Sequence, residues 1–309
     1  MTLLEQLSLL TTEGVNPRTA AIDRANAQEI VELLHAEDLG VAHAVGTQSA
    51  EIARAVELVA AAFRAGGRLL YIGAGTSGRL GILDASEMPP TYGTDPSMVQ
   101  GVIAGGNQAV FRSVEGAEDS PTEGARAIND AGVSSRDVVC GVSASGRTPF
   151  VLGALRAASE LGAATILIST NPREVVEQLI EGADVLICPV VGPEPITGST
   201  RMKSGTAQKM VLNMITTGAM VLLGKTYGNV MVDLQLTNEK LRQRAIRMVV
   251  SICGVDVVQA QDLLDRAGGH VKSALVMHAH ACSREEALVR LQAANGIVRT
   301  AMEKKNDAF

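Results

Sequence analysis

Five short apolar runs, alternating with segments of helical pattern, constrain the fold of this chain more than any other feature. They span residues 69–72, 98–103, 138–142, 165–168 and 185–191. Each is as long as a β-strand, and each gives way to Gly, Ser or Asn. Strands that are apolar on both faces alternate with helices in βαβ units, whose parallel sheets are covered on both sides. We therefore predict an α/β fold with a doubly wound, five-stranded parallel sheet over about residues 66–195.

Helical patterns lie on both sides of the predicted sheet in the sequence. In residues 1–65 apolar side chains recur with a helical period, so we expect an N-terminal helical segment that packs on the core. Residues 201–223 contain no proline and predict one long helix, with Ser199 and Thr200 as N-cap residues. The sheet and this helix are expected to form one domain of residues 66–249.

A repeat of 27 residues marks the C-terminal region, residues 250–309. Each copy is typical of a short helix, a glycine turn and a second helix, and Asp256 and Ser283 stand where an N-cap residue belongs. The matched positions are Gln259 with Glu286, Ala260 with Ala287, Leu264 with Leu291, Gly269 with Gly296 and Val271 with Val298. Two copies are too few for a solenoid, so we expect a small helical appendage that serves packing or dimerisation.

Composition and charge exclude several classes of protein. Hydrophobic residues make up 46% of the 309 residues and charged residues 19%, which is too apolar for a disordered chain. The net charge of −6, without a basic stripe, argues against a general nucleic-acid-binding protein. No apolar run approaches the roughly 18 residues of a membrane span, and residues 1–23 lack the pattern of a signal peptide. We expect a cytoplasmic protein that binds neither membrane nor nucleic acid.

The sequence gives no support to metal or disulfide chemistry. The four cysteines never form a CxxC pair, and the five histidines form neither an HExxH motif nor a catalytic triad. We therefore predict neither a metal site nor a disulfide framework.

Three loops rich in glycine and hydroxyl side chains follow predicted strands. They are residues 73–79 after the first strand, 143–149 after the third and 198–206 after the fifth. Ligands of open α/β sheets bind at the carboxyl ends of the strands, where backbone N–H groups, helix N-termini and hydroxyls suit a phosphate monoester. The candidate binding residues are Thr76, Ser77, Gly78, Arg79, Ser143, Ser145, Arg147, Thr148, Ser199 and Thr200. We predict a site for a small phosphorylated ligand.

Two nucleotide-binding alternatives fit less well. Gly73, Gly75 and Gly78 have the spacing of a dinucleotide-binding GxGxxG motif, but the second strand ends in Ala104-Gly105-Gly106, without the acidic residue that usually holds a ribose. The sequence also lacks the GxxxxGK[ST] pattern of a P-loop. Phosphosugar binding without a cofactor is favoured over both.

Two glutamates are candidate acid–base residues. Glu87 lies near the end of the first predicted helix, which Pro89-Pro90 is expected to end. Glu118 follows the helix after the second strand. Their neighbours Asp84, Glu115 and Asp119 compete for the same roles.

The motifs around these residues resemble those of the bacterial N-acetylmuramic acid 6-phosphate etherases. The similar stretches are GAGTSGRL at 73–80, DASEMPPTYG at 84–93, VEGAED at 114–119, SASGRTP at 143–149, residues 197–209, NVMVD at 229–233 and TNEKL at 237–241. The likeness runs over nearly the whole chain, and its later part is also similar to glucokinase regulatory protein, a relative that is not an enzyme. Both belong to the sugar isomerase (SIS) fold group, which agrees with the predicted sheet.

The resemblance implies an activity and residue roles. The family cleaves the D-lactyl ether of N-acetylmuramic acid 6-phosphate with water, giving N-acetylglucosamine 6-phosphate and D-lactate in cell-wall recycling. Its members are homodimers that use no metal or other cofactor. Glu87 matches the position of the family's proton donor, and Glu118 matches its second acid–base residue. Candidates to neutralise the phosphate or the lactyl carboxylate are Lys203, Lys272, Arg79, Arg147 and Arg201.

Two other functions share parts of this pattern. A phosphosugar sensor would keep the three loops but need neither glutamate. A phosphosugar isomerase would share removal of the C2 proton but release no lactate. The presence of both Glu87 and Glu118 in their motifs favours the etherase. We expect Glu118 to act as the base at C2 and Glu87 as the acid that protonates the departing lactate oxygen.

Overall fold

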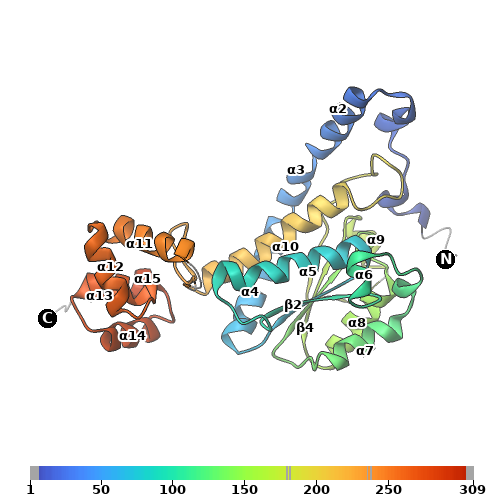
Figure 1. Cartoon of the computed structure of the whole chain (residues 1–309). Coiled ribbons are helices and arrows are strands. Elements are labelled where there is room, and N and C mark those ends of the chain that lie inside the picture. The colour runs from blue at the N-terminus through green and yellow to red at the C-terminus, as the bar shows by residue number, and fades with distance from the viewer. Residues whose placement is uncertain (1–6, 179, 181, 235, 237–238, 304–309) are drawn as a thin grey trace. The chain divides into compact units, whose positions relative to one another are not determined.

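A five-stranded parallel sheet forms the centre of the larger part of the chain (Figure 1). The computed structural model describes residues 7–178, 180, 182–234, 236 and 239–303. The strands are β1 (Leu69–Gly73), β2 (Val99–Ile103), β3 (Val138–Val142), β4 (Ala164–Ile168) and β5 (Val185–Ile187). Their order is β2-β1-β3-β4-β5, and every neighbouring pair is parallel. The predicted α/β sheet is confirmed.

The fifth strand is shorter than the sequence predicts. It ends at Ile187 rather than Val191. The backbone N–H of Cys188 donates instead to the side chain of Gln48, at 3.0 Å. Pro189 then has no N–H to offer to a strand ladder. The apolar run therefore continues past the point where pairing stops.

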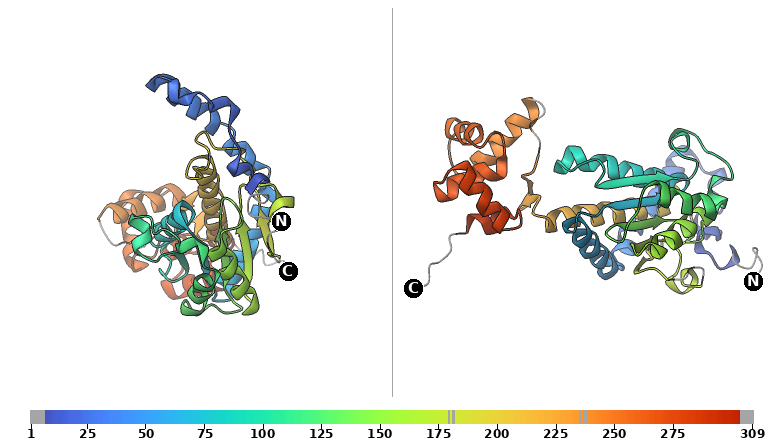
Figure 2. Two further views of the ribbon diagram at one scale, coloured as in Figure 1. Left: turned by 90° about the vertical axis from the view of Figure 1, so that its right-hand side faces the viewer. Right: turned by 90° about the horizontal axis from the view of Figure 1, so that it is seen from below.

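Helices cover both sides of the sheet, as Figures 1 and 2 show. Helices α7 (Pro121–Asp130), α8 (Pro149–Glu160) and α9 (Arg173–Val176) bury one face. Their side chains share an apolar cluster with alternate residues of the strands, namely Leu70, Ile72, Val139, Leu167 and Leu186. On the other face, α4 (Ser49–Arg64) contacts β1, β3 and β5, and Gly81 of α5 (Gly75–Tyr92) packs on Tyr71. The sheet is therefore doubly wound, as predicted.

Helix α5 continues past the two prolines that were expected to end it. Pro89 and Pro90 lie inside the helix, which runs to Tyr92. The fixed φ of proline suits a helix. Because proline has no N–H, the carbonyl four residues earlier loses its helical hydrogen bond. The backbone N–H of Gly93 still donates to Pro89 O at 3.0 Å, and Gly93 has a φ of +63°. This left-handed glycine ends the helix, so the predicted end is wrong by one turn.

The long helix α10 (Lys203–Leu222) forms, but its N-terminus differs from the prediction. Ser199 and Thr200 lie in the preceding turn and do not cap it. The buried carboxylate of Glu194 accepts hydrogen bonds from the backbone N–H groups of Lys203 and Ser204, both at 2.9 Å. A carboxylate at this position satisfies free N–H groups and favours the positive end of the helix dipole.

The N-terminal segment crosses the carboxyl edge of the sheet before it reaches α4. It contains the short helices η1 (Thr11–Glu13), η2 (Pro17–Thr19), η3 (Ile22–Arg24), α2 (Ala27–Asp38) and α3 (Val41–Gly46). The backbone N–H of Thr11 donates to Asn171 Oδ1 at 2.7 Å, and the hydroxyl of Thr19 donates to Pro195 O at 2.8 Å. These hydrogen bonds attach the segment to the loops after β4 and β5.

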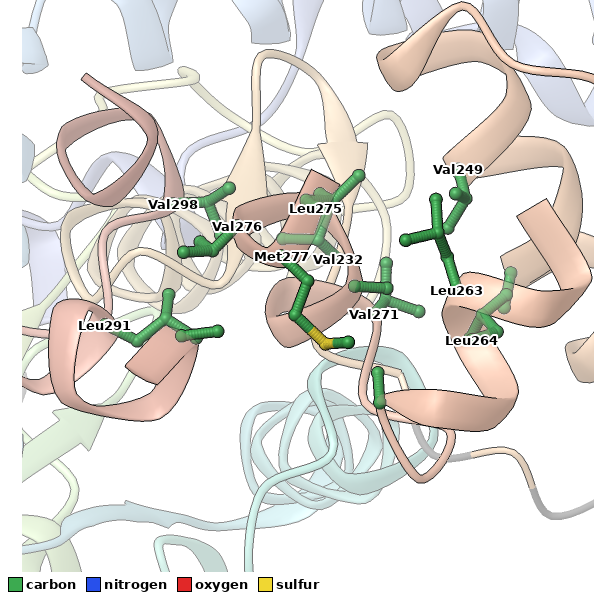
Figure 3. Packing of buried hydrophobic residues seen from close by; sticks show 14 of the residues in the cluster. Val232, Val249, Leu263, Leu264, Val271, Leu275, Val276, Met277, Leu291 and Val298 are labelled. Atoms are coloured by element: carbon green, nitrogen blue, oxygen red, sulfur yellow. The ribbon is translucent and has the colours of Figure 1, made fainter. Parts of the chain in front are cut away.

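The C-terminal helices have an apolar core of their own. Contacts divide the chain into two compact units, residues 1–86 with 96–218, and residues 87–95 with 219–309. The second contains α11 (Glu239–Cys253), α12 (Val257–Arg266), α13 (Val271–His280), α14 (Arg284–Ala293), α15 (Val298–Met302) and the hairpin β6 (Thr226–Tyr227) and β7 (Val230–Met231). Figure 3 shows Val249, Leu263, Leu275, Leu291 and Val298 from five helices in one cluster. The sequence boundary at residue 250 stays a prediction.

The two copies of the 27-residue sequence repeat have similar local structure. The Asp256 side chain accepts a hydrogen bond from Gln259 N at 2.8 Å, and Gln259 returns one to Asp256 N. Ser283 and Glu286 form the same capping box one repeat later. Each copy is a helix, a glycine turn and a second helix, because the local sequence sets both the start and the end of its first helix.

Candidate functional site

The turn between β1 and α5 is the tightest of the three predicted loops. A Cβ on Gly73 would lie 2.6 Å from Gly78 N, and one on Gly78 would lie 2.6 Å from the Ile103 side chain. These glycines allow the backbone to fold back on itself. Thr76 and Ser77 follow in the first turn of α5, whose backbone N–H groups have no partners within the helix. Such a turn suits an anion.

The loop between β3 and α8 brings three predicted hydroxyls together. Ser143 Oγ lies 2.8 Å from Thr148 Oγ1 and 3.4 Å from Ser145 Oγ, and it accepts a hydrogen bond from Gly146 N at 3.1 Å. Ser143 is buried, whereas Ser145, Arg147 and Thr148 are half-buried. The loop therefore presents hydroxyls at its rim around a buried serine.

Residues after β4, which the sequence prediction missed, hold this loop from behind. Thr170 Oγ1 donates to Ala144 O at 3.1 Å and also lies 3.0 Å from Ser204 Oγ. Asn171 Nδ2 donates to Ala144 O at 3.0 Å, and its Oδ1 accepts from Thr11. All are fully buried except Thr11 and Ala144. Ser169-Thr170-Asn171 directly follows a strand, as the other loops do, and that position was the available signal.

The N-terminus of α10 lies against the β1–α5 turn. A Cβ on Gly205 would lie 3.4 Å from Thr76 Cγ2, and Ser77 Oγ donates to Gln208 Oε1 at 2.9 Å. Ser199 and Thr200 are half-buried in the turn that precedes α10. The first and third predicted loops are therefore neighbours.

Lys203 was predicted to bind the substrate, but its side chain is buried in an ion pair. Its side chain is 2% exposed, and its Nζ lies 2.7 Å from Glu37 Oε2. Burial alone would raise the pKa of the Glu37 carboxyl, but hydrogen bonds from Arg18, Lys203 and Asn16 lower it to about 2. The ammonium of Lys203 is thus committed to a buried ion pair with the N-terminal segment. A substrate-binding role stays a prediction that this geometry does not support.

Glu118 and the β1–α5 turn line the same small cavity. The cavity measures about 150 Å³ and is bounded by Ala74, Gly75, Arg79, Ala104, Ala109 and residues 113–118. Glu118 lies in the short helix η4 (Ala117–Asp119) and is exposed. The guanidinium of Arg79 is fixed by donation from its Nε to Val110 O at 2.9 Å. A carboxylate, a guanidinium and a helix N-terminus therefore converge here.

Larger hollows along α8 lack this combination. One of about 610 Å³ is lined by Leu152, Leu155, Arg156, Ser159, Glu160, Gln178, Ile180 and Gly182. Another, of about 580 Å³, includes Arg147 from the β3–α8 loop but no hydroxyl of Ser143 or Ser145. Volume alone does not mark the site, because neither hollow joins a candidate acid–base residue to a candidate phosphate loop.

The structure separates the competing carboxylates by their surroundings. Glu87, on α5, is exposed, as are Glu115 and Asp119. Asp84 is buried, and it accepts hydrogen bonds from Tyr71 Oη at 2.9 Å and from Asn213 Nδ2 at 2.7 Å. Burial raises the pKa of the Asp84 carboxyl, which its hydrogen bonds oppose. Asp84 therefore serves the packing of α5 on α10 rather than chemistry in solvent.

The second compact unit contains two lysines and a histidine around one carboxylate. Asp233 Oδ2 lies 2.6 Å from Lys225 Nζ and 3.1 Å from Lys272 Nζ, and Asp233 Oδ1 lies 3.9 Å from His270 Nε2. Burial would raise the pKa of Asp233, but these partners hold it well below its usual range. Lys272, a predicted candidate for anion binding, is thus buried and paired. Among the described residues no group of three His, Cys, Asp or Glu side chains is placed to hold a metal ion.

Within the described residues no helix is both long and apolar enough to cross a membrane. The doubly wound parallel sheet, with hydroxyl-rich loops at its carboxyl edge, defines an SIS-type domain. Residues 51–159 match the glucokinase regulatory protein N-terminal SIS domain, and residues 228–273 match the C-terminal lid domain of glucokinase regulatory protein.

Relatives at high identity define the family more closely. The N-acetylmuramic acid 6-phosphate etherase of Salinibacter ruber is 56% identical over 97% of this chain and 96% of its own length. That of Symbiobacterium thermophilum is 57% identical over 88% of this chain and 89% of its own, and etherase 2 of Vibrio cholerae is 49% identical over 99% and 98%. The chain belongs to the N-acetylmuramic acid 6-phosphate etherase family, so the resemblance in its motifs is confirmed.

Proposed function

We propose that this chain cleaves the D-lactyl ether of N-acetylmuramic acid 6-phosphate with water, giving N-acetylglucosamine 6-phosphate and D-lactate. One observation carries the proposal: the cavity that joins the N-terminus of α5 to Glu118. It offers an anion-binding turn beside an exposed carboxylate. The family relationship, at 56% identity over 97% of the chain, supplies the substrate.

The chemistry needs an acid and a base rather than a cofactor. In the open-chain sugar the aldehyde at C1 acidifies the C2 proton, and Glu118 removes it. The C3–O bond then breaks while a carboxylic acid protonates the departing lactate oxygen; we propose Glu87 for this role from its motif, since it does not line the cavity of Glu118. Water adds to C3 of the unsaturated aldehyde, and the proton returns to C2. Atoms balance, because one water enters and one lactate leaves.

The phosphate end of the substrate supplies binding energy and orientation. We propose that the N–H groups and hydroxyls of 75–79 hold the phosphate, together with Ser143, Ser145, Thr148, Ser199 and Thr200. Binding at C6 positions the remote C2 and C3 for reaction. Arg79, Arg147 and Arg201 are the candidates for the lactyl carboxylate.

The test is D-lactate release in oxygen-18 water. Wild-type protein should release lactate and place the label on the sugar O3, since water attacks C3. Glu87→Ala should release none, whereas Glu57→Gln, which alters an exposed carboxylate of α4 outside the cavity, should stay close to wild type. Glu118→Gln should also stop exchange of the C2 proton with deuterated solvent. Unlabelled O3 would contradict C3–O cleavage.

A phosphosugar sensor is the second candidate, because both matched domains carry the description of glucokinase regulatory protein. A sensor would bind N-acetylglucosamine 6-phosphate and release no lactate. The lactate assay therefore separates the two functions directly.

We also propose a cytoplasmic homodimer that acts in cell-wall amino-sugar recycling. Helix α2 extends away from the sheet (Figure 1), and its Val31 and the C-cap residue Leu39 are 62% and 68% exposed. Apolar side chains on a projecting helix favour contact with a second copy. Light scattering during size-exclusion chromatography should give twice the 32.2 kDa mass of one chain.

A further inference from the structure

A buried amide between α5 and α10 has an unused donor. Gln208, in the second turn of α10, is 0% exposed. Its Oε1 accepts a hydrogen bond from Ser77 Oγ at 2.9 Å. Among the described residues, its Nε2 has no hydrogen-bond partner at all. Buried donors are almost always paired, so an unpaired one calls for an explanation.

The amide lies directly against the candidate phosphate loop. Its only described partner, Ser77, belongs to the first turn of α5. A Cβ on Gly205, three residues before Gln208, would lie 3.4 Å from Thr76 Cγ2. The helices therefore hold the amide head beside the N–H groups that would face a bound anion.

The present hydrogen-bond direction prevents Ser77 from donating to an anion. A serine hydroxyl has one proton, and here that proton goes to Gln208 Oε1. A phosphate dianion only accepts hydrogen bonds. If the amide turns by half a revolution, Nε2 donates to Ser77 Oγ and the hydroxyl proton becomes available. This rotation of the amide pairs Nε2 and leaves Oε1 without a partner. It also frees the Ser77 hydroxyl to donate to the ligand.

We propose that Gln208 is a positioning residue that sets the direction of the Ser77 hydroxyl proton. With the loop empty, Ser77 donates to Oε1. When a phosphate monoester occupies residues 73–79, Nε2 donates to Ser77 Oγ, and Ser77 donates to a phosphate oxygen. No covalent step is involved. The identity of the ligand as a phosphosugar rests on the proposed function.

Gln208→Glu tests the donor requirement at nearly constant shape. An ionised carboxylate only accepts, so it retains the Ser77 proton and adds negative charge beside the phosphate. We expect the affinity for N-acetylglucosamine 6-phosphate, measured by calorimetry at about pH 8, to fall by about 10-fold or more, the range of a hydrogen bond to a charged group. The penalty relative to wild type should shrink as the pH falls, because a protonated carboxyl can donate.

Gln208→Met keeps the length of the side chain but makes no hydrogen bond. It tests the same inference if the charged variant does not fold. It should raise KM about 3-fold to 10-fold with little change in kcat. In a Ser77→Ala background the same substitution should add nothing, because there is no hydroxyl left to orient.

Two results would overturn the inference: wild-type affinity in folded Gln208→Glu, or penalties of Ser77→Ala and Gln208→Met that simply add. The proposed function fails separately, if wild-type protein binds N-acetylglucosamine 6-phosphate but releases no lactate from the ether. That outcome would leave the binding test of Gln208 intact.

Discussion

The buried ion pair between Glu37 and Lys203 is expected to hold the N-terminal segment on the sheet. Both side chains are almost fully buried, at 1% and 2% exposure, and Nζ lies 2.7 Å from Oε2. Asn16 Nδ2 also donates to Glu37 Oε2, at 2.7 Å. Glu37→Gln keeps the shape but leaves the ammonium of Lys203 without a counter-charge. Breaking a buried pair in this way is strongly destabilising.

The magnitude follows from the pKa of Glu37. Burial raises it and the hydrogen bonds from Arg18, Lys203 and Asn16 lower it, with a net fall from 4.5 to about 2. At 1.36 kcal/mol for each pKa unit, ionised Glu37 contributes about 3 kcal/mol at neutral pH. Because the pKa is depressed on folding, this contribution is present above about pH 4.5 and is lost as the pH falls toward 2. At about pH 3 roughly 1.5 kcal/mol should remain.

Urea unfolding followed by far-ultraviolet circular dichroism measures this loss, since the chain contains no tryptophan. At about pH 7 the Glu37→Gln variant should lose about 3 kcal/mol, and its deficit should halve at about pH 3. The matched control is Glu177→Gln, which breaks an exposed pair with Arg173 and should cost less than about 1 kcal/mol. Equal midpoints for the Glu37 variant and the control would refute the reasoning.

Three further predictions concern the turn, the seam between α5 and α10, and the repeat. Gly78→Ala should lower stability by about 1–3 kcal/mol and raise KM, as measured by thermal melting and lactate release, because its Cβ would lie 2.6 Å from the Ile103 side chain. Burial raises the pKa of Asp84, so the contribution of this carboxyl to stability falls as the pH rises above about 4. The melting temperature of Asp84→Asn minus that of wild type should therefore increase as the pH rises from about 4 to about 7. Ser283→Ala removes one half of a capping box and should cost about 0.5–2 kcal/mol by the same melts, and an unchanged melting temperature would contradict the cap.

Local signals in the sequence predicted most of the fold. The five strands, the doubly wound order of sheet and helices, and the N-cap positions of Asp256 and Ser283 depend on residues close together in the chain. The end of α5 was wrong, because two prolines fit its last turns and the left-handed Gly93 ends it instead. A strong N-cap pair before α10 also misled, since Glu194, earlier in the same β5–α10 loop, occupies the free N–H groups.

In the candidate site too, features that depend on local sequence were predicted, and features that depend on distant residues were not. The glycine turn and the hydroxyls around Ser143 were predicted from their loops alone. Lys203 matched a binding pattern locally, but its partner Glu37 is 166 residues away and no local rule anticipates it. Asn171 was missed although its position in the loop after β4 was a local signal, and its hydrogen bonds with Thr11 and Ala144 are seen only in the structure. Pairing between distant polar groups becomes visible only in three dimensions.

The attachment of the N-terminal segment also sets an order of events during synthesis. The partner of Thr11, Asn171, lies 160 residues later in the chain, and the partner of Glu37, Lys203, lies 166 residues later. At ribosomal speeds of roughly 5–20 residues per second, Lys203 follows Glu37 on the order of ten seconds later. Residues 7–38 are therefore made before the residues that attach them to the sheet. For that interval they remain open to proteases and chaperones, and the loops around Asn171 and Lys203 are completed only when this first-made segment returns.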